Sequence, residues 1–186
     1  MFSKKRVIII FFGIILFLNC TTKDYLAKIN FDDELIFTGY NYEKLDVNHV
    51  NFDLFFYTKK IPEKNWFFTI YLKAYDKKTL INKETLSPQY SWSDRWPGNT
   101  ENDILKSTSK WEKDKIYKVS VPFHLNIDQG RNSIKSGFYD VKLSIISWEQ
   151  SENNEIIWSS LGYLDKDNIR RPSRMYPLFL NSLEIY

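Results

Sequence analysis

Apolar side chains recur at every second position along much of this chain, and this period constrains the fold more than any other feature. The alternation is clearest in residues 66–74, 116–125 and 139–145, and in the first of these Trp66 and Phe68 share one face. A period of two places successive side chains on opposite faces of a β-strand. These three segments are therefore predicted to be strands with one buried face.

Weaker alternation marks five further segments, and turn-forming residues separate most of them. They are residues 34–42, 51–57, 79–86, 156–161 and 178–186. No segment after Cys20 carries a helical stripe of ten or more residues. Seven or eight strands with short turns and no crossover helices predict an all-β fold, an antiparallel β-sandwich. A partly closed barrel is the alternative.

Two motifs add detail to this prediction. Residues 111–117 read Trp-Glu-Lys-Asp-Lys-Ile-Tyr, and residues 137–143 read Gly-Phe-Tyr-Asp-Val-Lys-Leu. The pair resembles immunoglobulin-like accessory domains, in which a Trp enters one strand and Gly-x-Tyr-x-Val-x-Leu forms a central one. The resemblance implies an immunoglobulin-like sandwich, and some domains of this kind belong to proteins that handle polysaccharides. It does not identify a ligand.

The N-terminus carries a different pattern. Lys4, Lys5 and Arg6 precede an apolar run over residues 7–18. As a helix this run would rise about 18 Å, short of the roughly 30 Å of a bilayer core. Its length and charged lead are typical of the apolar part of a secretory signal. The only cysteine of the chain, Cys20, stands at the junction with the polar sequence.

The segment Phe17-Leu18-Asn19-Cys20 resembles the end of a bacterial lipoprotein signal peptide of the spirochaete type. The resemblance implies cleavage before Cys20 and a diacylglyceryl group on its thiol. It divides the chain into a signal peptide (1–19), a lipid-anchored tether (20–30) and a β-sandwich domain (31–186). Thr21 stands where an Asp commonly retains such proteins in the inner membrane, which favours the outer membrane. A short uncleaved anchor or a plain secretory signal is the alternative.

Composition argues against most catalytic chemistry. One Cys cannot form an intrachain disulfide, and with two His it cannot complete a zinc cluster. Nucleophilic catalysis needs a base beside its nucleophile, but neither His49 nor His124 neighbours a Cys or a Gly-flanked Ser. We therefore expect no enzyme activity, no metal and no cofactor. A hydrolase with two carboxylates distant in sequence is the open alternative.

Residues 165–168 begin like a calcium loop, with oxygen-bearing side chains at alternate positions. Ile169 occupies the next ligand position, and Arg170 and Arg171 follow it. Two cations there would repel a metal ion. The segment is therefore predicted to be a solvated turn.

The longest irregular stretch is predicted over residues 87–110, and long loops are often functional. It contains Tyr90, Trp92, Arg95 and Trp96. Aromatic and Arg side chains supply much of the binding energy of interaction patches, so these four are candidate contacts for a sugar ring or a partner protein. In the alternative, the indoles fold back and cover one end of the sandwich.

Three arginines form a second candidate site. Arg170, Arg171 and Arg174 fall within five residues and are suited to grip phosphate or carboxylate. The alternative is that they pair with Asp165 or Asp167. The net charge of +3 equals the three N-terminal cations, so the rest of the chain is formally neutral. Such a chain lacks the broad basic face that nucleic acids require, and an anionic lipid headgroup or lipid-linked sugar phosphate fits better.

The sequence therefore predicts a lipid-anchored binding or interaction module of the cell envelope. Its expected partners are the membrane, through the anchor, and a protein or a glycan. A carbohydrate-binding envelope protein and an envelope hydrolase are the alternatives.

The anchor can be tested at its only thiol. Cys20→Ala should release the protein from membranes, because several acyl chains at about 0.8 kcal/mol per buried methylene group hold a domain almost permanently. Membrane fractionation and the intact mass of the processed chain measure this. A variant that stays in the membrane fraction with an unchanged processed mass would refute lipidation.

Overall fold

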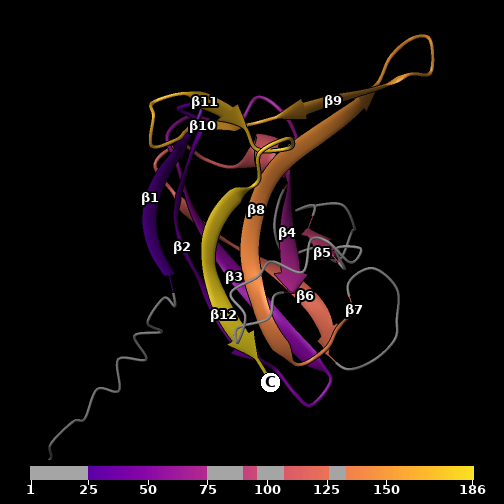
Figure 1. The fold of residues 1–186 in the computed structure, drawn as a ribbon. Coiled ribbons are helices and arrows are strands. Elements are labelled where there is room, and N and C mark those ends of the chain that lie inside the picture. The colour runs from indigo at the N-terminus through magenta and orange to yellow at the C-terminus, as the bar shows by residue number, and fades with distance from the viewer. Residues whose placement is uncertain (1–24, 75–89, 96–106, 126–132) are drawn as a thin grey trace, which may run out of the picture.

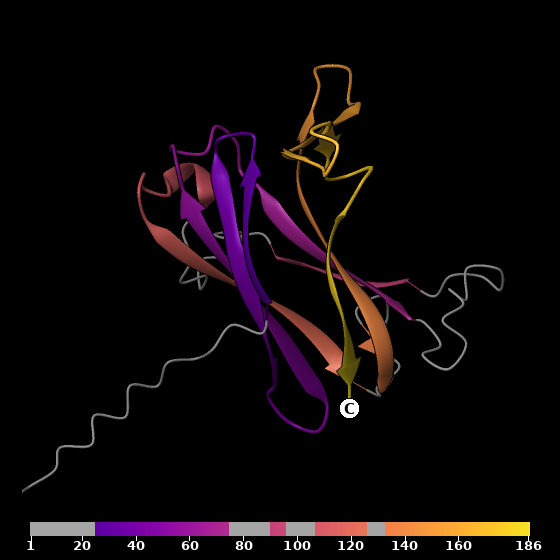
Figure 2. The ribbon, with the colours of Figure 1, turned by 60° about the vertical axis from the view of Figure 1, so that its left-hand side comes forward.

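The computed structural model describes residues 25–74, 90–95, 107–125 and 133–186. These residues form two β-sheets packed face to face, shown from two directions in Figures 1 and 2. Apart from a three-residue 3₁₀ turn, η2 (Thr108–Lys110), they contain no helix. No helix long and apolar enough to cross a bilayer occurs in them. The predicted all-β, largely antiparallel sandwich is confirmed.

The first sheet has seven strands in the order β11-β10-β1-β2-β3-β6-β7. All neighbours in it are antiparallel except β6 and β7, which run parallel. Its strands are β1 (Tyr25–Phe31), β2 (Leu35–Lys44), β3 (His49–Thr58), β6 (Ile116–Leu125), β7 (Ser133–Ile134), β10 (Gly162–Leu164) and β11 (Arg170–Pro172).

The second sheet has five strands. Four follow the order β12-β8-β4-β5, and β9 pairs with the far part of β8. All pairs are antiparallel. The strands are β4 (Phe67–Ala74), β5 (Tyr90–Arg95), β8 (Gly137–Gln150), β9 (Ile156–Ser160) and β12 (Leu178–Ile185).

Seven of the eight predicted strand segments coincide with strands, and the segment at 79–86 lies outside the described residues. The predicted total of seven or eight is too low, because β1, β5, β7, β10 and β11 were not expected. Most of these are short, so alternation over a few residues is not detectable. The sheet also begins at Tyr25, inside the segment assigned to the tether. The immunoglobulin-like resemblance stays a prediction.

The core lies between the sheets and is rich in aromatic rings. Phe56 of β3 contacts Phe68 of β4 with ring centroids 4.6 Å apart. Phe68 stacks on Trp111 at 5.8 Å, and Trp111 stacks on Tyr117 of β6 at 4.2 Å. Phe56, Phe68 and Trp111 are at most 1% exposed. This series of rings joins the two sheets, with Trp111 between Phe68 of β4 and Tyr117 of β6.

Removing that indole should be among the most damaging changes to the domain. We expect Trp111→Ala to lower the free energy of unfolding by about 3–5 kcal/mol, because a large cavity replaces a fully buried ring. Chemical denaturation measures the change. Ile156→Ala, at a side chain 58% exposed, is the control and should cost less than about 0.5 kcal/mol. Equal losses in the two variants would contradict the burial of Trp111 between the sheets.

Candidate functional site

A two-stranded ribbon extends β8 beyond the sandwich. β12 pairs with β8 over residues 137–143, and β4 pairs with it only as far as Ile146. From Ile146 to Gln150 its partner is β9. The ribbon projects from one end of the molecule in both views (Figures 1 and 2).

The ribbon closes through a tight polar turn. The N–H of Ser151 donates to the carbonyl of Glu155 at 2.8 Å, and the N–H of Asn154 donates to the carbonyl of Ser151 at 3.0 Å. Asn154 has a φ of 62°, a left-handed conformation that Asn adopts more readily than most residues. The turn thereby fixes the register in which β9 returns along β8.

Four large apolar side chains of this ribbon are exposed, and together they are called the hairpin surface. Trp148 and Trp158 are direct cross-strand partners, each 40% exposed. Ile156 is 58% exposed and Ile157 is 48% exposed. Since neighbouring residues of a strand face opposite ways, Ile157 lies on the face opposite to Trp158. Both faces of the ribbon therefore present apolar surface.

Trp158 is held in place from two sides. Its ring makes an edge contact with Phe67 of β4, with centroids 6.3 Å apart. The guanidinium carbon of Arg174 lies 4.5 Å from the centroid of the Trp158 ring, a cation–π arrangement. Arg174, predicted as an anion contact, thus lies against an aromatic face. The role of Arg174 in binding an anion stays a prediction.

The other two arginines of the predicted anion site are paired with carboxylates. Arg171 donates through Nε to Asp165 at 2.6 Å, as the alternative expected, and it also lies over the ring of Tyr176. Asp165 accepts the N–H groups of Asp167 and Ile169, which form the predicted turn. Arg170 pairs with Asp32, which is far away in the sequence. These contacts neutralise much of the positive charge that the sequence places here.

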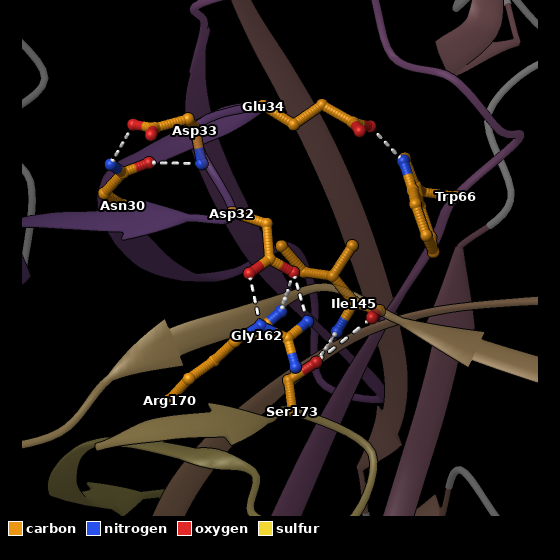
Figure 3. A network of polar contacts seen from close by, with 9 residues as sticks. All are labelled: Asn30, Asp32, Asp33, Glu34, Trp66, Ile145, Gly162, Arg170 and Ser173. Atoms are coloured by element: carbon orange, nitrogen blue, oxygen red, sulfur yellow. Dashed lines mark hydrogen bonds and ion pairs between the residues drawn. The ribbon is translucent and has the colours of Figure 1, made fainter.

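Asp32 clamps the β1–β2 turn to β10 and β11 (Figure 3). Its carboxylate accepts hydrogen bonds from Nε and Nη2 of Arg170 and from the N–H of Gly162, each at 2.6 Å. Its own N–H donates to the carbonyl of Gly162 at 3.0 Å. A Cβ at Gly162 would lie 2.7 Å from the Arg170 guanidinium carbon, so a glycine is needed for this close approach.

The clamp rests on an unusual turn. Asp32 and Asp33 both have a left-handed backbone, with φ of 49° and 56°. Hairpin turns often place Asp at the first such position but usually Gly at the second, which is Asp33 here. Asp33 is held by Asn30, whose side chain bonds both its N–H and its carboxylate, and by an ion pair with Lys59. A residue held in such a conformation costs about 1 kcal/mol or more, so it persists only where surrounding contacts hold it.

Ser173 fixes the segment that carries Arg174. Its hydroxyl donates to the carbonyl of Ile145 and accepts the N–H of the same residue, both at 3.0 Å (Figure 3). Its N–H donates to the carbonyl of Leu161 at 3.0 Å, and the side chain is fully buried. Ser173 therefore occupies the position beside β8 between the start of β12, which pairs with Leu143, and the end of β9, which pairs with Ile146. Arg174 follows directly, which sets it beside Trp158.

An open hollow of about 400 Å³ lies next to the clamp. Its walls include Lys28, Asn30, Asp33 and Tyr163, together with the paired Asp32 and Arg170. Glu34 lies nearby in the sequence but is 3% exposed and accepts a hydrogen bond from the indole N–H of Trp66. In the described part of the chain, no three His, Cys, Asp or Glu side chains are grouped so as to hold a metal ion.

Residues 90–95 are not part of a loop. They form β5, an edge strand in which Trp92 pairs with Tyr71 of β4 and Tyr90 pairs with Lys73. The alternation of Tyr90 and Trp92 with serines is a strand pattern that the flanking polar residues obscure. The prediction of one irregular stretch over 87–110 was wrong here. Trp96 lies outside the described residues, and the ligand role of Tyr90, Trp92, Arg95 and Trp96 stays a prediction.

The hairpin surface was not predicted, although the sequence contains a sign of it. Trp148 and Trp158 are placed symmetrically about the turn residue Asn153, and each adjoins a Ser. Equal spacing from a turn places two residues opposite each other in a hairpin. Comparisons of the chain with protein families, with curated proteins and with solved structures find no match.

Two buried or partly buried carboxyls should affect stability in opposite directions as pH changes. Burial of Asp32 opposes its ionisation, but Arg170 and the Gly162 N–H outweigh burial, so the pKa of Asp32 lies below its ordinary value of 3.8. Burial of Glu34 raises its pKa above the ordinary 4.5, and the bond from Trp66 offsets only part of this. Ionised Asp32 therefore stabilises the fold, while ionised Glu34 costs stability.

We expect Asp32→Asn to lower the free energy of unfolding at neutral pH. The difference from the parent protein should shrink only as the pH falls through the lowered pKa of Asp32 in the folded state. Glu34→Gln should stabilise it at neutral pH, because the amide oxygen still accepts the Trp66 bond. This advantage should disappear at about pH 4 and below, where Glu34 is protonated in both states. Urea denaturation at about pH 7, 4 and 3 measures both effects. The same sign for both variants at neutral pH would disprove the assignment.

Proposed function

We propose that this protein is a lipid-anchored module of the cell envelope that binds a partner protein through the hairpin surface. The observation that carries the proposal is the exposure of Trp148, Ile156, Ile157 and Trp158 on a ribbon that projects past the core. Burying a large apolar side chain is worth about 1.5–3 kcal/mol relative to leaving it exposed. Exposed large apolar side chains gathered on both faces of one projecting ribbon are typical of an interaction site.

The chemistry of the hairpin surface suits a protein partner. Trp is among the residues that contribute most to protein–protein binding, and Trp158 is already immobilised by Phe67 and Arg174. In the described part of the chain, β9 pairs with β8 alone, so its other edge is open to an added strand. A partner can thus gain both apolar contacts and backbone hydrogen bonds.

The position of the hairpin also supports a partner other than the bilayer. Phe31, the last residue of β1, pairs with β10 near the root of the hairpin, so β1 begins toward the opposite end of the sandwich. A strand of seven residues spans about 20 Å. The few residues between Cys20 and Tyr25 reach less than about 20 Å when fully extended. An anchor at Cys20 would therefore hold the hairpin surface away from the membrane.

A carbohydrate ligand is the less favoured alternative. Sugar rings stack on flat indole faces, but one face of Trp158 is covered by Arg174. Ile157, on the opposite face of the ribbon, offers no such platform. A two-sided apolar ribbon fits a protein groove or an added strand better than a single glycan chain.

Site-specific photo-crosslinking in cells tests the proposal. A photoreactive amino acid at Ile157 should give an adduct of discrete mass, because this side chain would face the partner. The same amino acid at Val47, which is 74% exposed in the β2–β3 turn, is the matched control and should give none. Adding Trp158→Ala should reduce the adduct at Ile157 severalfold, since the neighbouring anchor is lost.

Each result of this experiment has a defined meaning. An adduct at twice the mass of the chain identifies the partner as a second copy. A heterogeneous adduct that polysaccharide-degrading enzymes collapse favours the carbohydrate alternative and contradicts the proposal. No adduct at Ile157, or equal adducts at Ile157 and Val47, also refutes it.

A further inference from the structure

The two histidines of the chain lie side by side. His49 of β3 and His124 of β6 are far apart in the sequence but are direct cross-strand partners. Their ring centroids are 5.2 Å apart, with an angle of 65° between the planes. The chain has only these two imidazoles, and the sheet register brings them together.

Both rings are on the outer face of the seven-stranded sheet. Val50 and Phe123, which adjoin them along their strands, are fully buried in the core. Because side chains alternate along a strand, His49 and His124 point away from that core. Neither histidine is needed to fill the sandwich, and both are partly accessible to solvent.

Asp46 orients the His49 ring. Both carboxylate oxygens of Asp46 lie 2.9 Å from Nδ1 of His49. Because a carboxylate only accepts hydrogen bonds, Nδ1 carries the hydrogen and is the donor. The lone pair of the neutral ring is then on Nε2. A carboxylate that holds the other nitrogen in this way is the usual second partner of a metal-ligating histidine.

His124 has an unsatisfied nitrogen. Its Nδ1 is shielded from solvent and has no hydrogen-bond partner. A buried polar atom without a partner costs about 1–3 kcal/mol, so most such atoms in proteins are satisfied. A bound cation is one way to satisfy a nitrogen lone pair.

The separation of the rings leaves room for one ion between them. A zinc–nitrogen bond is about 2.0–2.1 Å, and the centroid of an imidazole is about 1.1 Å from its nitrogen, so each centroid is about 3.2 Å from the metal. With a tetrahedral angle between the bonds, two centroids are then about 5.1 Å apart. The observed 5.2 Å permits a shared ion, although ordinary ring pairs of this sheet such as Phe37 and Phe56 lie at a similar 5.5 Å, so it is Asp46 and the Nδ1 of His124 that indicate a metal site.

We propose that His49 and His124 form a binding site for a divalent transition-metal ion of the zinc class, oriented by Asp46. The described residues supply two ligands, and water completes the tetrahedron on the side of the ion that faces solvent. Among the described residues no third His, Cys, Asp or Glu joins the pair. The site is therefore a weak, exchangeable one on the surface of the sheet, and it is independent of the hairpin surface.

Calorimetric titration with Zn²⁺ tests the site. The full chain is used without a histidine tag and with Cys20→Ser, so that no thiol or added imidazole competes. We expect one ion per chain. His49→Gln, His124→Gln and the double variant should each lose binding to the same extent, because two ligands that share one ion fail together. Asp46→Asn should weaken binding about tenfold, as expected when the carboxylate that orients a metal-binding imidazole is lost.

Lys118→Gln is the matched control, since Lys118 lies on the same face of β6 and pairs with Asp53. It should bind Zn²⁺ as the parent does. Circular dichroism in the presence of a chelator should show that every variant is folded at the temperature of the titration, which separates ligand loss from unfolding. Zn²⁺ binding that survives in the double variant, or single variants that each keep half of the sites, would overturn the proposal. So would the absence of binding at millimolar Zn²⁺ in the parent protein.

Discussion

β8 is longer than the sandwich that contains it, and this mismatch shapes the rest of the molecule. Its first half is held between β12 and β4, but its last residues run past both of these strands. Backbone groups beyond that point need another partner, and β9 supplies it by folding back. Between the pairing of β8 with β12 and its pairing with β9, the hydroxyl of Ser173 hydrogen-bonds the backbone N–H and carbonyl of Ile145 in place of a strand. The projecting ribbon, the exposed tryptophans and the placement of Arg174 all follow from this extension.

Charge pairing explains why the arginine-rich segment does not form a free basic patch. Arg170 and Arg171 are each bonded to a carboxylate at 2.6 Å, and Arg174 lies on an indole. The partner of Arg170, Asp32, comes from a turn at the other end of the sequence. Arg170, Gly162 and Asp32 form one unit. Gly162 leaves space for the Arg170 guanidinium, and the Asp32 carboxylate accepts hydrogen bonds from both of these residues. The same contacts tie the last third of the chain to its first hairpin.

The period-two pattern was enough to predict the fold class and most long strands, because alternation over eight or more residues reports directly which face is buried. It failed for β10 and β11, whose three residues each carry no period, and for β1, which lies in a segment assigned to the tether. Of the candidate site residues, only the pairing of Arg171 with Asp165 was anticipated, since those residues are close in sequence. The contacts of His49 with His124 and of Arg170 with Asp32 depend on sheet register and strand order. The alternation of apolar residues shows which face of a strand is buried but not which strand lies beside it or in which register.

The direction of the strands has a mechanical consequence. If the chain is fixed at Cys20 and a partner pulls on the hairpin, the load enters through the start of β1 and leaves through the far end of β8. Both strands run along the length of the sandwich, so their hydrogen bonds are loaded side by side in shear and must break together. Unzipping, in which bonds break one after another, would require a pull across the strands. The geometry thus favours a domain that resists extension between its anchor and its tip.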